Sequence, residues 1–430
     1  MLGAFMSAFR TPDLRKKLLF VLFIIAVFRL GSQVPAPGVN TSNVQACFQN
    51  SKDGIYGLIN MFSGGALLQL TIFALGIMPY ITASIILQLL VVVIPRLEAL
   101  KKEGQAGQAK ITQYTRYLTL GLAILQATGI VALARTGNLL QDCNRDLLYK
   151  NDTMTAIILV VTMTAGTVVI MWLGELITER GIGNGMSILI FAQIIATFPI
   201  ALWQVEKAKG PWIFSAVIIV GIAVMAAVVF IEQAQRRIPV QYARRMVGRK
   251  MFGGSSTYIP LKVNQAGVIP VIFASSLLYL PAMLVQFNQN STSPWVRWVS
   301  EHLVRGDHPI YMVTYFLMII FFTYFYVAIT FEPKEVADNM KQYGGFIPGI
   351  RAGKPTEDYL AYVLSRITAP GSLYLGIVAL IPLIALVMVN ANQDFPFGGT
   401  SLLIMVGVAL DTIKQIESQL QQRNYEGFLR

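Results

Sequence analysis

The stretch Ile55–Ile94, IYGLINMFSGGALLQLTIFALGIMPYITASIILQLLVVVI, contains two apolar segments of unequal length. The second, Ile72–Ile94, is long enough to cross a hydrocarbon layer of about 30 Å as a helix. The first, Ile55–Leu70, is too short to cross and is interrupted by Gly64-Gly65. Broken backbone at membrane depth needs protein or a water-filled cavity around it. The pattern therefore predicts a half-helix inside a cavity, with a hairpin on the outer membrane interface as the alternative.

The composition of the whole chain also indicates a membrane protein. Of 430 residues, 55% are apolar and 13% are charged, and the mean hydropathy is +0.58. A soluble chain carries about a quarter charged residues, so this chain cannot cover a globule of its size with polar groups. Two cysteines and two histidines are too few for Cys/His zinc clusters or a disulfide framework. No metal or cofactor is expected, and whether Cys47 and Cys143 pair stays open.

Apolar runs of membrane-spanning length recur along the sequence. The last run is shorter than the others and is counted because it places both basic termini on one side of the membrane. No small-residue cleavage site follows the basic N-terminus, so the first run is expected to remain as a span. The predicted spans lie near residues 18–34, 72–94, 117–134, 154–174, 182–203, 211–231, 266–287, 310–331, 371–390 and 397–412.

The basic residues predict the orientation of these spans. With the N-terminus inside, twenty-five of the 34 lysines and arginines fall in inner segments and eight in outer loops. Inner loops of membrane proteins carry such an excess of Lys and Arg. We therefore expect a multi-pass membrane protein with both termini on the inner, cytoplasmic side.

Several classes of function lack the residues they need. The middles of the predicted spans contain no Asp, Glu, Lys or His, whereas ion-coupled transporters keep such groups near the midplane. The glycine-rich run Gly181–Gly185, GIGNG, lacks the spacing of a nucleotide-binding loop. Its glycines are better explained by a hinge or by close helix packing. No enzymatic activity is expected.

Several longer motifs carry a family resemblance. They include NMFSGGAL (Asn60–Leu67), MWLGELITERGIGNGMSI (Met171–Ile188), PLKVNQAGVIPVIFASS (Pro260–Ser276), EVADNMKQYGGFIPGIRAG (Glu335–Gly353) and FGGTSLLI (Phe397–Ile404). In these motifs the chain resembles the SecY family, the pore subunits of the bacterial protein-translocation channel. The motifs span nearly the whole chain in order, whereas the outer loops 137–152 and 287–307 match no pattern.

The resemblance implies an all-α integral membrane protein with ten transmembrane helices. These would form two pseudo-symmetric inverted halves, residues 1–205 and 206–430, around an hourglass channel with a half-helix plug at about residues 55–70. Such a channel passes unfolded polypeptides across the membrane and releases hydrophobic segments sideways into lipid. A secondary transporter for a neutral solute remains the alternative, because an uncharged midplane does not exclude one.

The resemblance also implies a ring of aliphatic side chains that closes the waist. A narrow apolar collar empties of water and so blocks ions without a charged filter. Ordinary helix or lipid packing is the alternative for each residue. The ring would consist of Ile77, Ile81, Met186, Ile190, Ile272 and Ile404.

Two further features of the family are expected here. The plug would consist of Asn60, Met61, Phe62, Ser63, Gly64, Gly65, Ala66 and Leu67. A lateral gate would open to lipid between spans two and three and spans seven and eight. Gln88 and Asn264 lie about 10–16 Å and 12 Å inward of the ring, so they could hydrogen-bond across this gate, or each could face cytoplasmic water.

Partners are expected at the two longest inner loops, residues 236–262 and 334–366. The family docks the ribosome, through its RNA, or the SecA motor ATPase there, although positive-inside bias alone could explain the charge. The other implied partners are a SecE-like helical subunit, a SecG-like subunit, signal sequences, nascent polypeptides and membrane lipid. The expected contacts are Arg236, Arg237, Arg244, Arg245, Arg249, Lys250 and Arg351.

Overall fold

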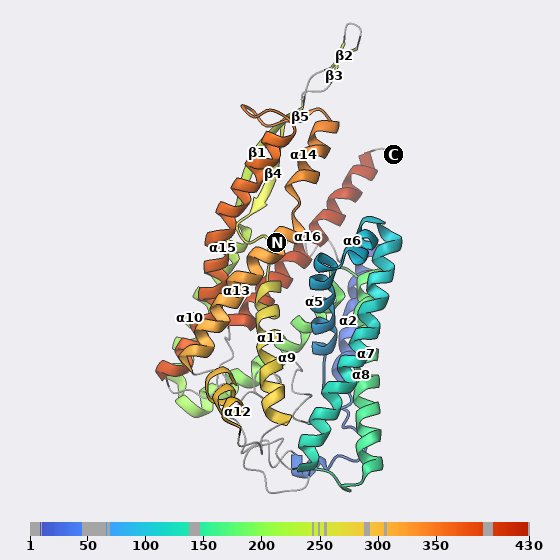
Figure 1. Cartoon of the computed structure of the whole chain (residues 1–430), viewed down its shortest axis with the longest axis vertical. Coiled ribbons are helices and arrows are strands. Elements are labelled where there is room, and N and C mark those ends of the chain that lie inside the picture. The colour runs from blue at the N-terminus through green and yellow to red at the C-terminus, as the bar shows by residue number, and fades with distance from the viewer. Residues whose placement is uncertain are drawn as a thin grey trace.

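The computed structural model describes residues 9, 11–44, 66, 69–136, 147–242, 245–247, 250–252, 256–287, 293–304, 308–389 and 399–428. Within these residues the chain is predominantly helical, and a β-hairpin projects from one end of the helix bundle (Figure 1). The long helices are α2 (Pro12–Gly31), α5 (Met78–Val93), α7 (Gln105–Thr136), α8 (Thr153–Arg180), α9 (Gly185–Lys209), α10 (Pro211–Gln233), α11 (Ile269–Phe287), α13 (Pro309–Thr330), α15 (Lys354–Val389) and α16 (Gly399–Phe428). Shorter helical elements are α6 (Pro95–Lys102), α12 (Pro294–Val299), the π-helical turn η1 (Ser300–Val304) and α14 (Pro333–Gln342).

Several helices reach membrane-spanning length. In the described part of the chain, four helical segments are long and apolar enough by themselves: Gln105–Arg135, Thr153–Arg180, Pro309–Gln342 and Lys354–Ile381. A fifth is obtained if α5 and α6 count as one span, although they meet at a bend of 99°. The bend lies at Ile94, which is extended (φ −99°, ψ 111°) before Pro95, because a proline disfavours helical backbone in the residue before it.

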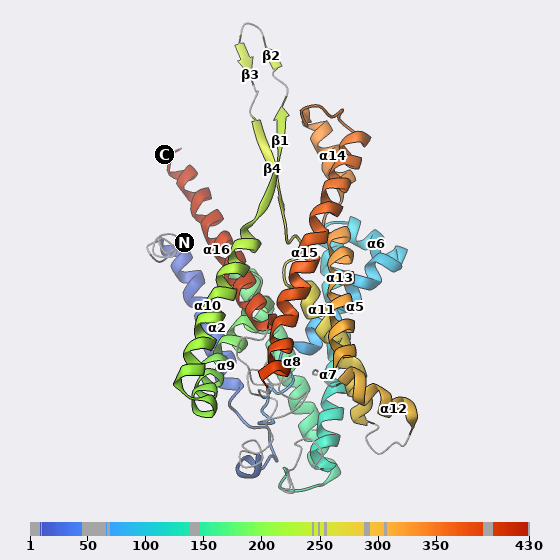
Figure 2. The same ribbon diagram turned by 90° about the vertical axis from the view of Figure 1, so that its left-hand side faces the viewer.

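The prediction of an all-α chain is wrong in the first basic loop. Strand β1 (Gln235–Tyr242) pairs antiparallel with β4 (Ser256–Lys262), with Gln235 opposite Lys262. A second short hairpin of β2 (Arg245–Val247) and β3 (Lys250–Phe252) extends beyond them (Figure 2). Ile238 and Val240 are buried while their neighbours along the strand are exposed. This alternation with period two is typical of a half-buried strand.

The two basic loops form one packed unit, which we call the cap. Strand β5 (Gly345–Phe346), from the second loop, pairs with β1 from the first, giving the order β4-β1-β5. The cap consists of these three strands, α14 and the start of α15. Their buried apolar side chains form a separate core: Ile238, Val240, Leu261, Met340, Ile347, Leu360 and Val363.

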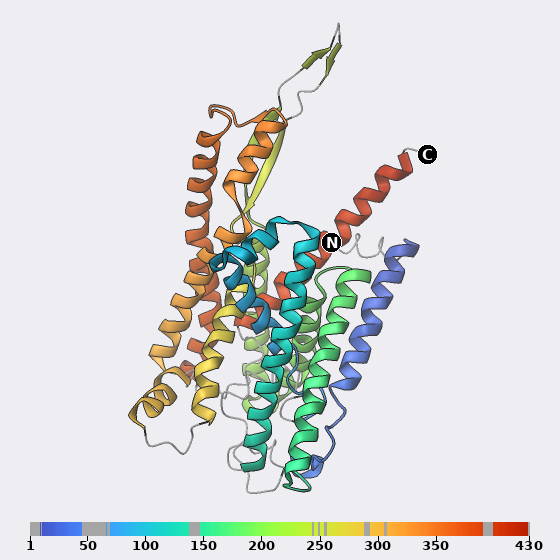
Figure 3. The ribbon, with the colours of Figure 1, turned by 45° about the vertical axis from the view of Figure 1, so that its right-hand side comes forward.

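Below the cap, most of the buried apolar side chains belong to two large clusters. The larger cluster joins residues of α2, α5, α8, α9, α10, α11, α13, α15 and α16, and in it the rings of Phe28 and Phe73 stack at 5.8 Å. The smaller cluster joins α7, α8 and the segments near residues 36–44 and 70–75. The start of α2 and the end of α16 both point toward the end of the molecule that carries the cap (Figures 2 and 3).

Candidate functional site

The six ring candidates belong to one apolar core although they lie on, or directly before, four different helices. Ile77 directly precedes α5 and Ile81 lies on it, Met186 and Ile190 lie on the first turns of α9, and the last two lie on α11 and α16. Five of them are buried members of the larger cluster, and Ile272 is partly buried and packs against it. Ile77 and Ile404 are each 1% exposed. The structure therefore places every ring candidate in the interior of the bundle.

A cavity of about 470 Å³ lies beside three of these residues, Ile190, Ile272 and Ile404. It lies at the cap end of the bundle, because α10 leads directly into β1 and β4 leads back to α11. The helices around it come from both predicted halves of the chain. The rest of its lining is largely polar and includes Asn184, Ser187, Glu232, Lys262, Asn264, Gln265, Asp411, Thr412 and Lys414.

The turn between α8 and α9 fixes the position of Met186 and Ile190. The side chain of Asn184 caps α9, since its Oδ1 accepts hydrogen bonds from the backbone N–H of Met186 at 3.1 Å and of Ser187 at 3.4 Å. Thr178 Oγ1 accepts from the N–H of Gly185 at 2.9 Å and donates to the carbonyl of Gly174 at 3.0 Å. The glycines of this run thus serve close packing and a tight turn.

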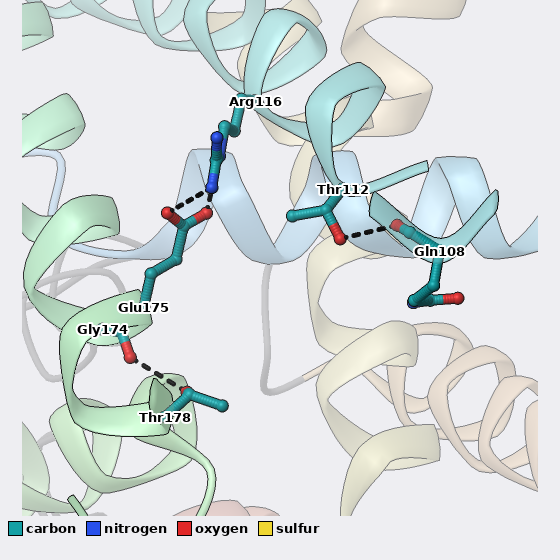
Figure 4. A network of polar contacts seen from close by, with 6 residues as sticks. All are labelled: Gln108, Thr112, Arg116, Gly174, Glu175 and Thr178. Carbon is teal, nitrogen blue, oxygen red and sulfur yellow. Dashed lines mark hydrogen bonds and ion pairs between the residues drawn. The ribbon is translucent and has the colours of Figure 1, made fainter. Parts of the chain in front are cut away.

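An ion pair holds the same end of α8 against α7 (Figure 4). Arg116 Nε donates to Glu175 Oε1 at 2.9 Å, and its Nη2 donates to Oε2 at 2.8 Å. This bidentate geometry is the strong form of an arginine–carboxylate contact. Glu175 directly follows Gly174, so the pair fixes the helix segment on which the turn to α9 depends.

Two glycine substitutions should differ sharply in their effect. A Cβ at Gly185 would lie 1.8 Å from the backbone oxygen of Gly174, whereas a Cβ at Gly174 would meet the Sδ of Met186 at 2.4 Å. Backbone cannot yield without separating α8 from α9, but a methionine side chain can rotate. We expect Gly185→Ala to cost at least the upper end of about 1–3 kcal/mol and Gly174→Ala clearly less. Thermal unfolding of the detergent-purified variants measures this, and equal losses would contradict the packing described.

Of the two alternatives for Gln88 and Asn264, the hydrogen bond between them is absent from this structure, which describes both residues. Gln88 is exposed, whereas Asn264 is 3% exposed. The amide nitrogen of Asn264 donates to the carboxylate of Glu232 and to the carbonyl of Gly267. The tertiary partner of Asn264 is therefore α10, which the spacing of the two amides could not indicate.

The plug candidates fall mainly outside the described residues. Ala66 is described: it is 1% exposed, and its carbonyl accepts from the backbone N–H of Thr71 at 3.1 Å and from Thr71 Oγ1 at 3.3 Å. Outside the described residues lie Asn60, Met61, Phe62, Ser63, Gly64, Gly65 and Leu67, together with Cys47 and Cys143.

The described basic contacts lie on the cap, on the hairpin β2–β3 beyond it and in the turn before α15. Arg236 and Arg237 are exposed on β1, and the guanidinium carbon of Arg237 lies 4.8 Å from the ring centre of Tyr258, a cation–π distance. Arg351 is exposed in the turn before α15, where its carbonyl accepts from Thr356 Oγ1 at 2.8 Å. Arg245 and Lys250 lie on β2 and β3. Arg244 and Arg249 lie outside the described residues.

The fold and these sites define a helical membrane protein with an apolar core below the cap. The sequence profile of the SecY family matches residues 71–413, so the chain belongs to the SecY family. It is 68% identical over 438 residues to the protein translocase subunit SecY of Streptomyces galbus, with 100% of both chains covered. It is 58% identical over 442 residues to that of Mycobacterium tuberculosis strain H37Rv, again with 100% of both chains covered.

Solved structures show the same fold at low sequence identity. One reported as "The structure of a protein conducting channel" has a TM-score of 0.64 at 18% identity, covering 94% of this chain and 91% of that chain. Sec61 in the canine ribosome-channel complex from the endoplasmic reticulum has a TM-score of 0.62 at 17% identity, with the same coverage. The chain is accordingly a protein translocase subunit in a family of membrane channels that are not enzymes.

Proposed function

We propose that this chain itself forms the gated conduit for unfolded polypeptides and that its six ring residues close that conduit at rest. The observation that carries the proposal is the convergence of Ile190, Ile272 and Ile404, from three helices, on one cavity that polar side chains also line. A hydrated polypeptide could enter the cavity from the cap side and would then meet an apolar constriction. This order of surfaces is suited to a gated pore.

The constriction would exclude ions without any charged or reactive group. A narrow constriction with apolar walls loses its water, so ions meet a desolvation barrier. Aliphatic side chains make no directional contacts, so polypeptides of any sequence can slide past them. The work of translocation would come from a partner outside the membrane, and hydrophobic segments would leave sideways through a gate between spans two and three and spans seven and eight.

We further propose ten transmembrane helices in two inverted halves, residues 1–205 and 206–430. In support, each predicted apolar run overlaps one of the long helices. The last run, predicted to end at residue 412, lies within α16, which continues to Phe428. That extra length would carry the chain out of the membrane on the cap side. The cap and both termini would then lie in the cytoplasm of a bacterial cell.

The cap is the proposed docking surface for a ribosome or the SecA motor ATPase. Its exposed arginines Arg236, Arg237 and Arg351 come from two loops that share one core. Anionic RNA is bound through such groups. Two channels with this fold, Sec61 from dog and Ssh1 from yeast, are described in complexes with ribosomes. SecE-like and SecG-like subunits would complete the assembly within the membrane.

Deletion of Asn60–Leu67, the proposed plug, should unmask ion conductance in the resting protein. The proposal places this segment against the outer side of the ring, so its loss weakens the seal without touching the waist. Conductance is measured in planar bilayers that contain the channel with its partner subunits. A deletion variant that inserts normally and adds no conductance would contradict the plugged pore.

A further inference from the structure

A buried carboxylate lies near the end of α10, where the sequence pattern had indicated no functional group. Glu232 is 8% exposed and lines the cavity beside the ring. Its Oε1 accepts a hydrogen bond from Nδ2 of Asn264, which is also buried. Burial of a polar pair is costly unless the two groups satisfy each other. The contact is therefore specific to this arrangement of α10 and the segment before α11.

Asn264 also contacts the turn that leads into α11. The same Nδ2 donates to the carbonyl of Gly267 at 3.1 Å, which holds a turn in which Gly267 has φ +62°. The next residue, Val268, accepts through its carbonyl from the N–H of Ile272 at 3.3 Å. A short chain of contacts thus leads from Glu232 to the ring residue of α11.

The backbone around Asn264 is held on other sides as well. The N–H of Val263 donates to the carbonyl of Ala234 at 3.0 Å, which joins the two strands of the cap where they enter the bundle. Gly371 of α15 packs so closely that a Cβ there would lie 2.4 Å from the carbonyl oxygen of Val263. Residues 263–267 are therefore held by α10, by Ala234 just before β1 and by α15. Among the described residues, the Glu232 carboxylate is the side-chain acceptor for the amide nitrogen of Asn264.

We propose that Glu232 is a positioning residue for the constriction: it clamps Asn264, sets the first turn of α11 and thereby holds Ile272 in the ring. The proposal rests on the role proposed above for the ring. Without the clamp, the start of α11 is free to move and the seal at Ile272 loosens. The resting channel then conducts ions more often.

The clamp requires a hydrogen-bond acceptor at residue 232 and does not require a charge. The charged groups that line the same cavity are Lys262, Asp411 and Lys414, and Lys262 Nζ lies 3.6 Å from Asp411 Oδ1. Glu232→Gln keeps an oxygen that can accept from Asn264. Glu232→Leu removes the acceptor at similar volume. A comparison of these two variants therefore separates the clamp from an effect of charge in the cavity.

The test is the resting ion conductance of reconstituted channels. We expect Glu232→Leu and Asn264→Leu each to raise the open population by about 3- to 20-fold, the factor that one hydrogen bond within a membrane protein supports. The double variant should exceed neither single variant, and Glu232→Gln should behave as the unchanged protein. Glu179→Leu, at an exposed glutamate near the end of α8, is the matched control. If the Glu232→Leu protein does not accumulate, Asn264→Ala takes the place of Glu232→Leu in the comparison, because it removes the hydrogen-bond donor instead of the acceptor.

Each other outcome has a distinct meaning. Equal leakage of Glu232→Gln and Glu232→Leu would overturn the clamp in favour of a charge effect. If Ile404→Asn raises the resting conductance but Glu232→Leu and Asn264→Leu do not, the clamp is overturned and the ring is still supported. Additive leakage in the double variant would show that the two side chains act separately. If the double variant Ile81→Asn with Ile404→Asn does not raise the resting conductance, the proposed ring is overturned, and with it the clamp that depends on it.

Discussion

Replacement of Ile81 and Ile404 together by asparagine should make the resting channel conduct small ions continuously. The two residues are 9% and 1% exposed and come from α5 and α16, on different sides of the proposed waist. An amide in an apolar collar binds water, and a wetted collar no longer excludes ions. The effect should be larger than that of either single substitution, and addition of Ile190→Asn should increase it further. The measurement is the current across planar bilayers at a fixed potential with no translocating substrate.

The matched control keeps the apolar volume of the ring. Ile81→Leu with Ile404→Leu should leave the resting current unchanged, because only the shape of two aliphatic side chains differs. If the triple asparagine variant inserts normally and its current equals that of the leucine variant, these residues do not form the seal.

Arg351→Glu should abolish partner-driven export while the chain still assembles in the membrane. Arg351 is exposed and makes no ion pair with the described residues, so reversal of its charge leaves no structural partner behind. A charge reversal at a contact with an anionic partner should weaken binding by at least about tenfold. The measurement is the affinity of reconstituted channels for ribosomes and for SecA, followed by export of a reporter protein.

Two further variants separate this contact from the general charge of the cap. Lys341→Glu makes the same change at another exposed position, on α14, and should have the smaller effect. Arg351→Lys keeps the charge but loses the planar fork of arginine, so an intermediate affinity is expected. If the Arg351→Glu channel binds ribosomes and SecA with unchanged affinity, the positive charge of this loop serves membrane orientation alone.

The helical membrane architecture was predictable because the bilayer imposes a length on its spans. Each long helix overlaps an apolar run that the sequence shows directly. The ring candidates were predictable only from the motifs of the family. By residue type alone, an isoleucine in the ring cannot be distinguished from an isoleucine that faces lipid. Helix α5 begins later than the apolar run from residue 72 predicts: residues 72–77 form turns, and the helix begins at Met78 next to Pro79, a residue favoured at helix N-termini.

The cap and the clamp could not be predicted because both depend on distant contacts. Strand β5 has two residues and exists through its pairing with Tyr242 and Gln241. The alternation at Ile238 and Val240 is short and is flanked by arginines, so the sequence alone predicts a basic loop there. Glutamate side chains are mostly exposed in proteins, so a carboxylate at a helix end such as Glu232 is expected to face water. The burial of Glu232 follows from the position of Asn264, which local pattern does not reveal.

The most direct test of the conduit is cross-linking of a polypeptide stalled in translocation. A cysteine in the stalled chain would be challenged with single cysteines at Ile190, Ile272 or Ile404, in a background without Cys47 and Cys143. Controls are cysteines at Ile219 and Val161, which are 68% and 61% exposed on the outside of the bundle. The account predicts cross-links at the three ring positions and none at the controls, and only while a chain is stalled. Cross-links at Ile219 or Val161 with none at the ring would contradict a path through the centre of this chain.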